Sequence, residues 1–213
     1  SMNKNKYWDF FYKKQVNKIN LNYPSQFATF TVGETENVTT LLEFGCGNGR
    51  DALFFRHHFR KVYAFDGSNE VINKNKKLYS KIKNLKFSKF NLNNEFNNYH
   101  ILSCKKKTIY ARFFLHALTN IEIKSFISLC SDLLNKDERL YIEYRTEKDK
   151  KRNKETQKHY RNYINPNLIN KLLKKFNLKN VYFVKGLGFA KYKNDDAFVA
   201  RHIIEKLDVQ KKN

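Results

Sequence analysis

The chain has 213 residues, 41% of them hydrophobic, and its 42 Lys and Arg against 20 Asp and Glu give a formal net charge of +22. This length fits one domain with a sizeable core, and no apolar run approaches the ~18 residues that a membrane-spanning helix needs. The three cysteines, Cys46, Cys104 and Cys130, form no Cys-x-x-Cys pair. We therefore expect no disulfide framework, no metal site and a cytoplasmic location.

The positive charge permits two interpretations. Lysines are spread along most of the chain, as codon bias in an AT-rich genome would produce, and no RNA-binding signature accompanies them. A positive field would also favour an anionic small substrate. The sequence favours the first interpretation and keeps nucleic acid open as an alternative partner.

The first 37 residues predict an N-terminal helical cap. Residues 4–20 carry apolar side chains at helical spacing. Trp8 and Tyr12 in this helix belong either to the core or to a lid over a ligand pocket. A turn at residues 24–28 leads into a short helix, and residues 31–37 predict a polar linker.

The next stretch, residues 41–67, predicts a ligand-binding crossover. A strand at 40–44 stops at the glycine-rich turn Gly45-Cys46-Gly47-Asn48-Gly49, a helix follows at 50–59, and a second strand at 61–65 ends on Asp66. Glycines let the backbone turn sharply and let a ligand approach it closely. Asp66 lies 21 residues beyond Gly45, about where a carboxylate binds the ribose of a nucleoside.

The remaining elements complete an alternating pattern. Ser68 is expected to cap a helix to about residue 83, and Asn120 a helix to about residue 134. Strands are predicted at 85–90, 107–112 and 139–144, then a long polar loop at 145–163 and a helix at 166–176. Residues 181–184 and 198–204 are expected to pair as an antiparallel hairpin.

This pattern predicts an α/β fold, a Rossmann-like doubly wound, seven-stranded, mostly parallel sheet with a C-terminal antiparallel hairpin. We expect a single domain over residues 1–213. Residues 1–37 would form the cap, 38–145 the ligand-binding core, and 146–213 the substrate loop, helix and closing hairpin. Ligands in such sheets lie outside the carboxyl ends of the strands.

The string from Glu43 to Gly49 resembles the first motif of class I S-adenosylmethionine-dependent methyltransferases. The resemblance implies S-adenosyl-L-methionine as cofactor and S-adenosyl-L-homocysteine as product, with Asp66 on the ribose diol and Asn91 near the adenine. The implied cofactor-binding residues are Glu43, Gly45, Cys46, Gly47, Asn48, Asp51, Asp66, Gly67, Ser68, Asn91, Leu92 and Phe114.

The end of the fourth strand bears on the methyl acceptor. Methyltransferases acting on planar nitrogens typically carry Asn/Asp-Pro-Pro-Tyr/Phe there, whereas this chain has Ala111-Arg112-Phe113-Phe114-Leu115-His116. This argues against such acceptors. His116 is either an ordinary buried histidine or, with Arg112 beside it, the catalytic base or orienting group for a hydroxyl.

The later part of the chain suggests an anion-binding loop. Arg145, His159, Tyr160 and Arg161 interrupt a lysine-rich background, and arginines can clamp an anion through forked hydrogen bonds. A solvated charged loop is the alternative interpretation of the neighbouring charge run.

Taken whole, the chain resembles small bacterial methyltransferases associated with capsular polysaccharide gene clusters. The shared strings are YWDFFYKK, PSQFA, LEFGCGNGRD, ARFFLHAL, IEYRTEKD, HYRNY and ARHIIEK. The resemblance implies O-methylation of a small anionic acceptor, such as a phosphoramidate or sugar-nucleotide capsule precursor. Its substrate-binding residues would be Trp8, Tyr12, Arg145, His159, Tyr160 and Arg161, while Asn162 stands where a second arginine is expected. The alternatives are an RNA methyltransferase and a non-catalytic S-adenosylmethionine-binding interaction subunit.

Overall fold

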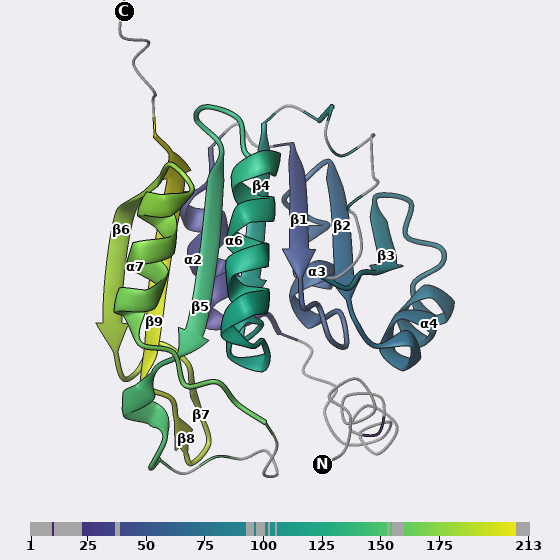
Figure 1. Cartoon of the computed structure of the whole chain (residues 1–213). Coiled ribbons are helices and arrows are strands. Elements are labelled where there is room, and N and C mark those ends of the chain that lie inside the picture. Colours follow the sequence, from purple (N-terminus) through teal and green to yellow (C-terminus); the bar gives the residue numbers. More distant parts are fainter. Residues whose placement is uncertain are drawn as a thin grey trace, which may run out of the picture.

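The computed structural model describes residues 10, 23–36, 39–92, 96, 101, 103–104, 106–152, 154 and 160–207. Its centre is a seven-stranded sheet of order β3-β2-β1-β4-β5-β9-β6 (Figure 1). The strands are β1 (Thr40–Phe44), β2 (Lys61–Asp66), β3 (Leu85–Lys89), β4 (Lys107–Arg112), β5 (Arg139–Arg145), β6 (Leu178–Gly186) and β9 (Val199–Lys206). Only β9 runs antiparallel to its neighbours in the sheet. The predicted fold class is confirmed.

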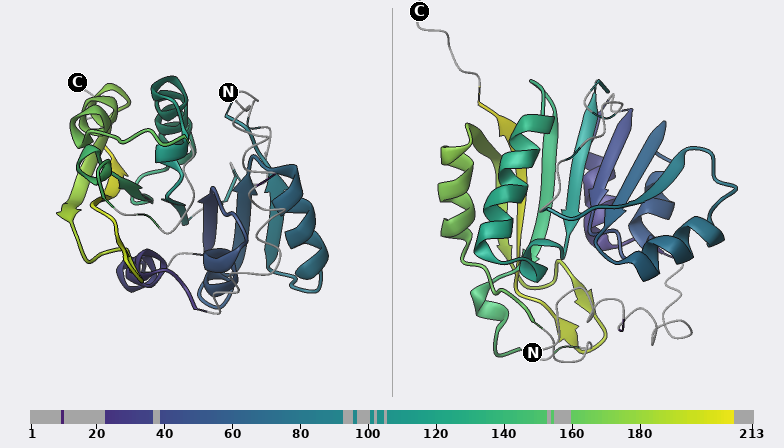
Figure 2. Two further views of the ribbon diagram at one scale, coloured as in Figure 1. Left: turned by 90° about the horizontal axis from the view of Figure 1, so that it is seen from below. Right: turned by 45° about the vertical axis from the view of Figure 1, so that its right-hand side comes forward.

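Helices cover both faces of the sheet (Figures 1 and 2). One face carries α2 (Gln26–Glu34), α3 (Arg50–Phe55) and α4 (Asn69–Leu78), and the other carries α6 (Asn120–Leu133) and α7 (Pro166–Lys175). Short 3-10 turns, η1 (Leu115–Ala117) and η2 (Glu147–Asp149), follow β4 and β5, and a small ribbon pairs β7 (Lys191–Tyr192) with β8 (Asp195–Asp196). Among the helices that the structure describes, none is long and apolar enough to cross a membrane.

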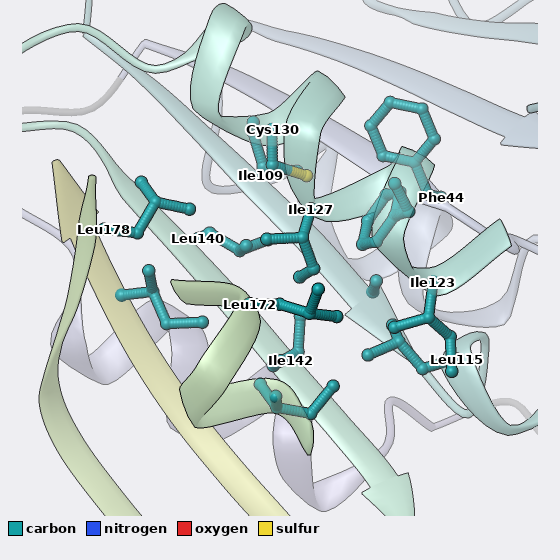
Figure 3. Packing of buried hydrophobic residues seen from close by; sticks show 14 of the residues in the cluster. Phe44, Ile109, Leu115, Ile123, Ile127, Cys130, Leu140, Ile142, Leu172 and Leu178 are labelled. Atoms are coloured by element: carbon teal, nitrogen blue, oxygen red, sulfur yellow. The ribbon is translucent and has the colours of Figure 1, made fainter. Parts of the chain in front are cut away.

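The alternation of strand side chains divides the core into two apolar layers. Leu42 and Phe44 of β1 face α6 and α7, whereas Leu41 of the same strand faces α2, α3 and α4. Figure 3 shows the first layer, in which Ile123 and Ile127 of α6 pack on the sheet. The burial of both faces of the sheet explains why β1, β4 and β5 are buried along nearly their whole length.

Several boundaries differ from the sequence prediction, including α4, which ends at Leu78 instead of about residue 83, and β6, which begins at Leu178 instead of residue 181. Helix α2 continues to Glu34, through residues expected to be a linker, because Thr31 is fully buried and its hydroxyl donates to the carbonyl of Phe27. Helix α6 is capped by Thr119 rather than Asn120, since Thr119 and Glu122 form a reciprocal capping box. Helix α3 ends at Phe55, where Asn84 donates to the carbonyl of Arg56.

The topology fixes the position of the ligand site. Strands β1 and β4 are adjacent, but the helices that follow them lie on opposite faces. This is the switch point at which a doubly wound sheet opens a crevice beyond its carboxyl ends. Apart from residue 10, the predicted helix at 4–20 lies outside the described residues, and so do Trp8, Tyr12 and the predicted acceptor residue His159.

Candidate functional site

The glycine turn after β1 is packed so tightly that two of its positions admit only glycine. Gly45 has φ +76°, and a Cβ there would lie 2.7 Å from Cδ2 of Phe114. Gly49 has φ +79°, and its Cβ would lie 3.0 Å from Cζ of Phe87. Both dihedrals are strained for other residues. Phe114, a predicted cofactor residue, therefore lies directly against the turn.

Asp66 joins this turn to the next one along the sheet. One carboxylate oxygen accepts from the backbone N–H of Gly47, and the other accepts from that of Ser68, each at 2.9 Å. Asn91, at the end of β3, lies over the same turn, because its Oδ1 is 2.9 Å from where a Cβ on Gly67 would stand. Asp66, Gly67, Ser68 and Asn91 are thus brought together, as predicted.

Asn75 of α4 supports the turn from outside and was not predicted. It is buried, and its amide donates to the carbonyl of Gly47 at 2.8 Å. One of three asparagines in a lysine-rich helix gives no signal in the sequence. Asn48 and Cys46 have local roles: Asn48 accepts from the N–H of Arg50, and the N–H of Cys46 bonds to β2. Burial raises the pKa of the Cys46 thiol, which keeps it neutral.

Among the described residues, Glu43 gives the clearest indication that a ligand binds at this site. Its side chain is only 4% exposed, and Oε2 has no hydrogen-bond partner within the described structure. Burial, and then the carboxylates of Asp51 and Asp66, raise the pKa of Glu43 well above its usual range. A buried acceptor without a donor is costly. The turn, Asp66, Asn91 and this carboxyl group together fit S-adenosylmethionine, which presents ribose hydroxyls, an adenine and an ammonium group.

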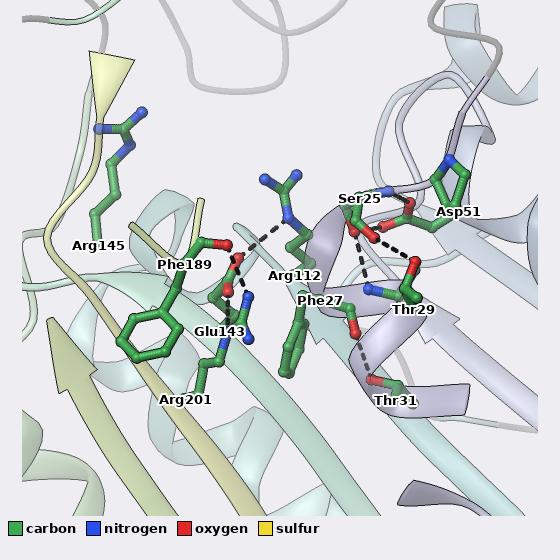
Figure 4. A network of polar contacts seen from close by, with 12 residues as sticks. Ser25, Phe27, Thr29, Thr31, Asp51, Arg112, Glu143, Arg145, Phe189 and Arg201 are labelled. Carbon is green, nitrogen blue, oxygen red and sulfur yellow. Dashed lines mark hydrogen bonds and ion pairs between the residues drawn. The ribbon is translucent and has the colours of Figure 1, made fainter. Parts of the chain in front are cut away.

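Asp51 has a different role from the one predicted. Its carboxylate accepts from the N–H of Ser25 at 2.8 Å, the hydroxyl of Ser25 at 2.7 Å and the hydroxyl of Tyr110 at 2.7 Å (Figure 4 shows the Ser25 contacts). Arg50 beside it donates to the carbonyls of Tyr23 and Pro24. These contacts anchor the start of α2 on α3. The structure therefore does not favour Asp51 as a direct ligand of the cofactor.

Arg112 lies at the carboxyl end of β4 with its side chain 22% exposed. Its Nε donates to Glu143 Oε1 at 3.1 Å, and its guanidinium stacks 4.0 Å from the centre of the Phe113 ring. Phe113 itself has a positive φ of 52°, a conformation that costs energy in a bulky residue and is typical of functional sites.

His116 is buried in η1, directly beyond β4. Its Nδ1 accepts the backbone N–H of Arg145 at 3.3 Å. A neutral imidazole whose Nδ1 is an acceptor carries its proton on Nε2. In that form neither ring nitrogen has an open lone pair to take up a proton, which favours the orienting role over that of a base.

Arg145 is not available as the predicted anion clamp. Its Nη1 donates to Asp149 at 2.8 Å and to Asp195 at 3.1 Å, and its Nη2 donates to Asp195 at 2.6 Å. Figure 4 shows Arg145 apart from the group formed by Arg112, Glu143 and Arg201. Asp195 lies in β8, 50 residues further along the chain, and the sequence gave no sign of this pairing.

The segment around Asn162 returns to the site and is fastened to η1. The N–H of Asn162 donates to the carbonyl of His116 at 2.7 Å, and its side-chain amide donates to Leu118 and Asn120. This explains why Asn162 stands where an arginine was expected. Tyr160, 53% exposed, and the half-buried Arg161 are thereby held near the end of β4.

A doubly wound sheet with one antiparallel strand, a glycine turn after β1 and an acid after β2 define a class I S-adenosylmethionine-dependent methyltransferase. Residues 13–182 match the family model described as a methyltransferase domain. The chain belongs to this family. The predicted enzyme class and its cofactor, S-adenosylmethionine, are confirmed, whereas the capsule-associated subgroup is not tested. No curated protein matches the sequence.

Solved structures show the same fold at low identity. An S-adenosylmethionine-dependent methyltransferase from Anabaena variabilis is 15% identical, with a TM-score of 0.72 over 97% of this chain and 96% of that chain. One from Methanosarcina mazei is 15% identical, with a TM-score of 0.68 over 84% and 97%. Phosphoethanolamine N-methyltransferase 1 from Haemonchus contortus, solved with phosphoethanolamine and S-adenosylhomocysteine, is 13% identical, with a TM-score of 0.71 over 99% of this chain and 50% of that one.

Proposed function

We propose that this methyltransferase transfers the methyl group of S-adenosylmethionine to an oxygen of a small anionic metabolite. The observation that carries the proposal is the anchoring of Asn162 on η1, which holds Tyr160 and Arg161 beside His116 where β4 ends. A cation, a phenol and a buried imidazole near one strand end suit an anionic oxygen acceptor.

The chain's own residues would bind and align rather than carry out proton chemistry. When bound, S-adenosylmethionine supplies the electrophilic methyl group. The glycine turn, Asp66 and Asn91 hold the nucleoside, and Arg161 draws in the acceptor. His116, whose Nδ1 accepts the Arg145 N–H, lies beside the end of β4 and orients the acceptor oxygen. An acceptor oxygen that is already ionised requires no base, and alignment alone then lowers the barrier.

Within this class we favour a phosphorylated acceptor, specifically a phosphoramidate or sugar-nucleotide precursor of capsular polysaccharide. The resemblance of the ARFFLHAL, IEYRTEKD and HYRNY strings supports this choice. The similar fold of a methyltransferase solved with phosphoethanolamine is compatible with it. The proposal places the reaction in the cytoplasm.

The test is formation of S-adenosylhomocysteine from S-adenosylmethionine with sugar nucleotides, phosphoramidate esters and RNA as separate acceptors. We expect turnover with a phosphorylated small molecule. Arg161→Ala should raise the acceptor KM at least tenfold, and Arg60→Ala, an exposed residue at the other end of the sheet, should not change it. His116→Ala should lower kcat, and turnover within about twofold of the wild type would refute its assigned role.

Two other outcomes would replace the proposal. Methylation of RNA, with an affinity that falls with salt at about −0.7 per phosphate contact in log units, would favour the RNA methyltransferase. Binding of S-adenosylhomocysteine without turnover on any acceptor would favour a non-catalytic interaction subunit.

A further inference from the structure

The loop after β5 and the β7–β8 ribbon are fastened to each other beyond the carboxyl end of the sheet, the end at which β4 also stops (Figure 1). Arg145 bonds to Asp149 of the loop and to Asp195 of the ribbon. Arg152 Nε of the loop donates to the carbonyl of Asp196 in the ribbon at 2.9 Å. The two segments therefore form one body, although they lie far apart in the chain. We call their described residues, 146–152, 154 and 187–198, the end unit.

The end unit keeps its acidic groups inside and its basic groups outside. The carboxylates of Asp149 and Asp195 are buried against Arg145. Asp196 is half-buried, and its Oδ1 accepts the N–H of Gly188. Among the described residues of the end unit, this leaves Glu147 as the one exposed acid. The exposed cations, which we call the basic rim, are Lys148, Lys150, Lys151, Arg152, Lys191 and Lys193.

The basic rim is joined to the acceptor site by the segment around Asn162. The N–H of Asn162 bonds to the carbonyl of His116, and the next residue, Tyr163, has Nζ of Lys154 5.3 Å from its ring centre. Lys154 in turn donates to the carbonyl of Arg152 at 2.6 Å. A continuous run of contacts thus leads from His116 to the basic rim.

We infer that the basic rim binds a second anionic group of the acceptor, the diphosphate of a nucleotide-type carrier. Several separated cations with their carboxylates turned inward favour a ligand with several charges over one with a single charge. Five of the six are lysines, which bind phosphate as point charges on flexible stems and so tolerate a flexible diphosphate. The inference rests on the proposed function, within which it selects a sugar nucleotide over an acceptor charged only at the methylated group.

Inorganic pyrophosphate and orthophosphate are the probes for the basic rim. In calorimetric titrations of the full chain with S-adenosylhomocysteine present, pyrophosphate should bind about tenfold more tightly than orthophosphate, because it meets more than one cation. The double variant Lys150→Glu, Lys151→Glu should weaken pyrophosphate binding about tenfold and orthophosphate binding by no more than about twofold.

A charge-matched control tests whether position matters. The double variant Lys76→Glu, Lys77→Glu changes the net charge equally at exposed sites on α4, and it should leave both affinities within about twofold of the wild type. Equal losses of pyrophosphate affinity in the two double variants would assign the effect to net charge and overturn the inference. Equal affinity of the wild type for the two probes, or no binding of pyrophosphate, would also overturn it.

Kinetics separate the inference from the proposed function. Lys150→Glu, Lys151→Glu should raise KM about tenfold for a diphosphate-linked acceptor and leave kcat unchanged, because the basic rim does not touch the reacting oxygen. Turnover of a monophosphate acceptor at the KM of its diphosphate-linked form would overturn the inference and leave the proposed function in place. Pyrophosphate binding on the basic rim, without methyl transfer to any small phosphorylated molecule, would overturn the proposed function alone. An RNA oligonucleotide that bound more tightly than pyrophosphate, and was lost in the same double variant, would assign the basic rim to nucleic acid instead.

Discussion

Two arginines at the ends of neighbouring strands have opposite electrostatic surroundings. Arg112 ends β4, Arg145 ends β5, and both guanidinium groups lie near the ring of Phe113, at 4.0 and 5.2 Å from its centre. Arg112 shares a single carboxylate, that of Glu143, with a second arginine. Arg145 is enclosed by two carboxylates, those of Asp149 and Asp195.

The balance of charge around each arginine indicates its role. Two arginines on one carboxylate leave a positive excess, and the terminal nitrogens of Arg112 stay available to a ligand. Two carboxylates on one arginine leave a negative excess, which Lys154 partly offsets at 3.8 Å from Asp149. Arg145 therefore stabilises the loop that follows β5, whereas we propose that Arg112 serves binding.

The largest expected effect is the loss of stability in Arg145→Met. The substitution removes the guanidinium that Asp149, which has no exposed surface, and Asp195, 7% exposed, share, and leaves Asp149 only the longer contact to Lys154 at 3.8 Å. Breaking a buried ion pair on one side costs about 3–5 kcal/mol. Urea unfolding followed by circular dichroism should show this loss.

A triple variant checks the cause. Adding Asp149→Asn and Asp195→Asn to Arg145→Met removes the two carboxylate charges that Arg145 neutralises. Most of the free energy of unfolding lost in Arg145→Met should therefore return. A loss that persists in the triple variant would mean that packing, not charge, makes Arg145 necessary.

Arg112→Met should cost less, about 1–2 kcal/mol, because it removes one charged hydrogen bond and Glu143 keeps Arg201 as a partner. The same urea experiment measures it. If Arg112→Met unfolded as readily as Arg145→Met, the two arginines would be equally structural and the comparison would fail.

The cofactor half was largely predictable because its signals are local. Gly45, Gly49 and Asp66 lie within 22 residues of sequence, and each is required by the backbone geometry or hydrogen bonds of one crossover. The strands at 40–44 and 107–112 were also predicted with their observed bounds. Periodic apolar residues and glycine turns determine such features without distant partners.

The acceptor half was less predictable because its contacts join distant segments. Arg145 resembled a free arginine in the sequence until the fold brought Asp195 to it, 50 residues later. Arg201 and Glu143 meet across 58 residues. A charged residue in an otherwise apolar strand predicts a buried ion pair, but strand order must be known before the partner can be named. His116 lies directly after β4, as its place in the sequence predicts, while the hydrogen bond to its Nδ1 comes from the backbone N–H of Arg145 on another strand.

The smallest expected effect concerns Glu43. Here the substitution should raise the stability of the fold instead of lowering it. Burial, with Asp51 and Asp66 nearby and Arg112 opposing them, raises the pKa of Glu43 in the folded chain. A carboxyl group with a raised pKa stabilises the fold at low pH, and this contribution is lost as pH rises from about 4.3, the unfolded value, through the folded one. Glu43→Gln cannot ionise, so it should be more stable than the wild type at pH 8, with the difference vanishing near pH 4. Urea unfolding at the two pH values measures this difference.

The same variant should bind S-adenosylhomocysteine more weakly, because a Gln side chain carries no negative charge to pair with the ammonium group of this ligand. Lower stability of Glu43→Gln than of the wild type at pH 8 would show that the Glu43 carboxyl group has a structural hydrogen-bond partner. Its buried Oε2 would then be no evidence for a bound ligand.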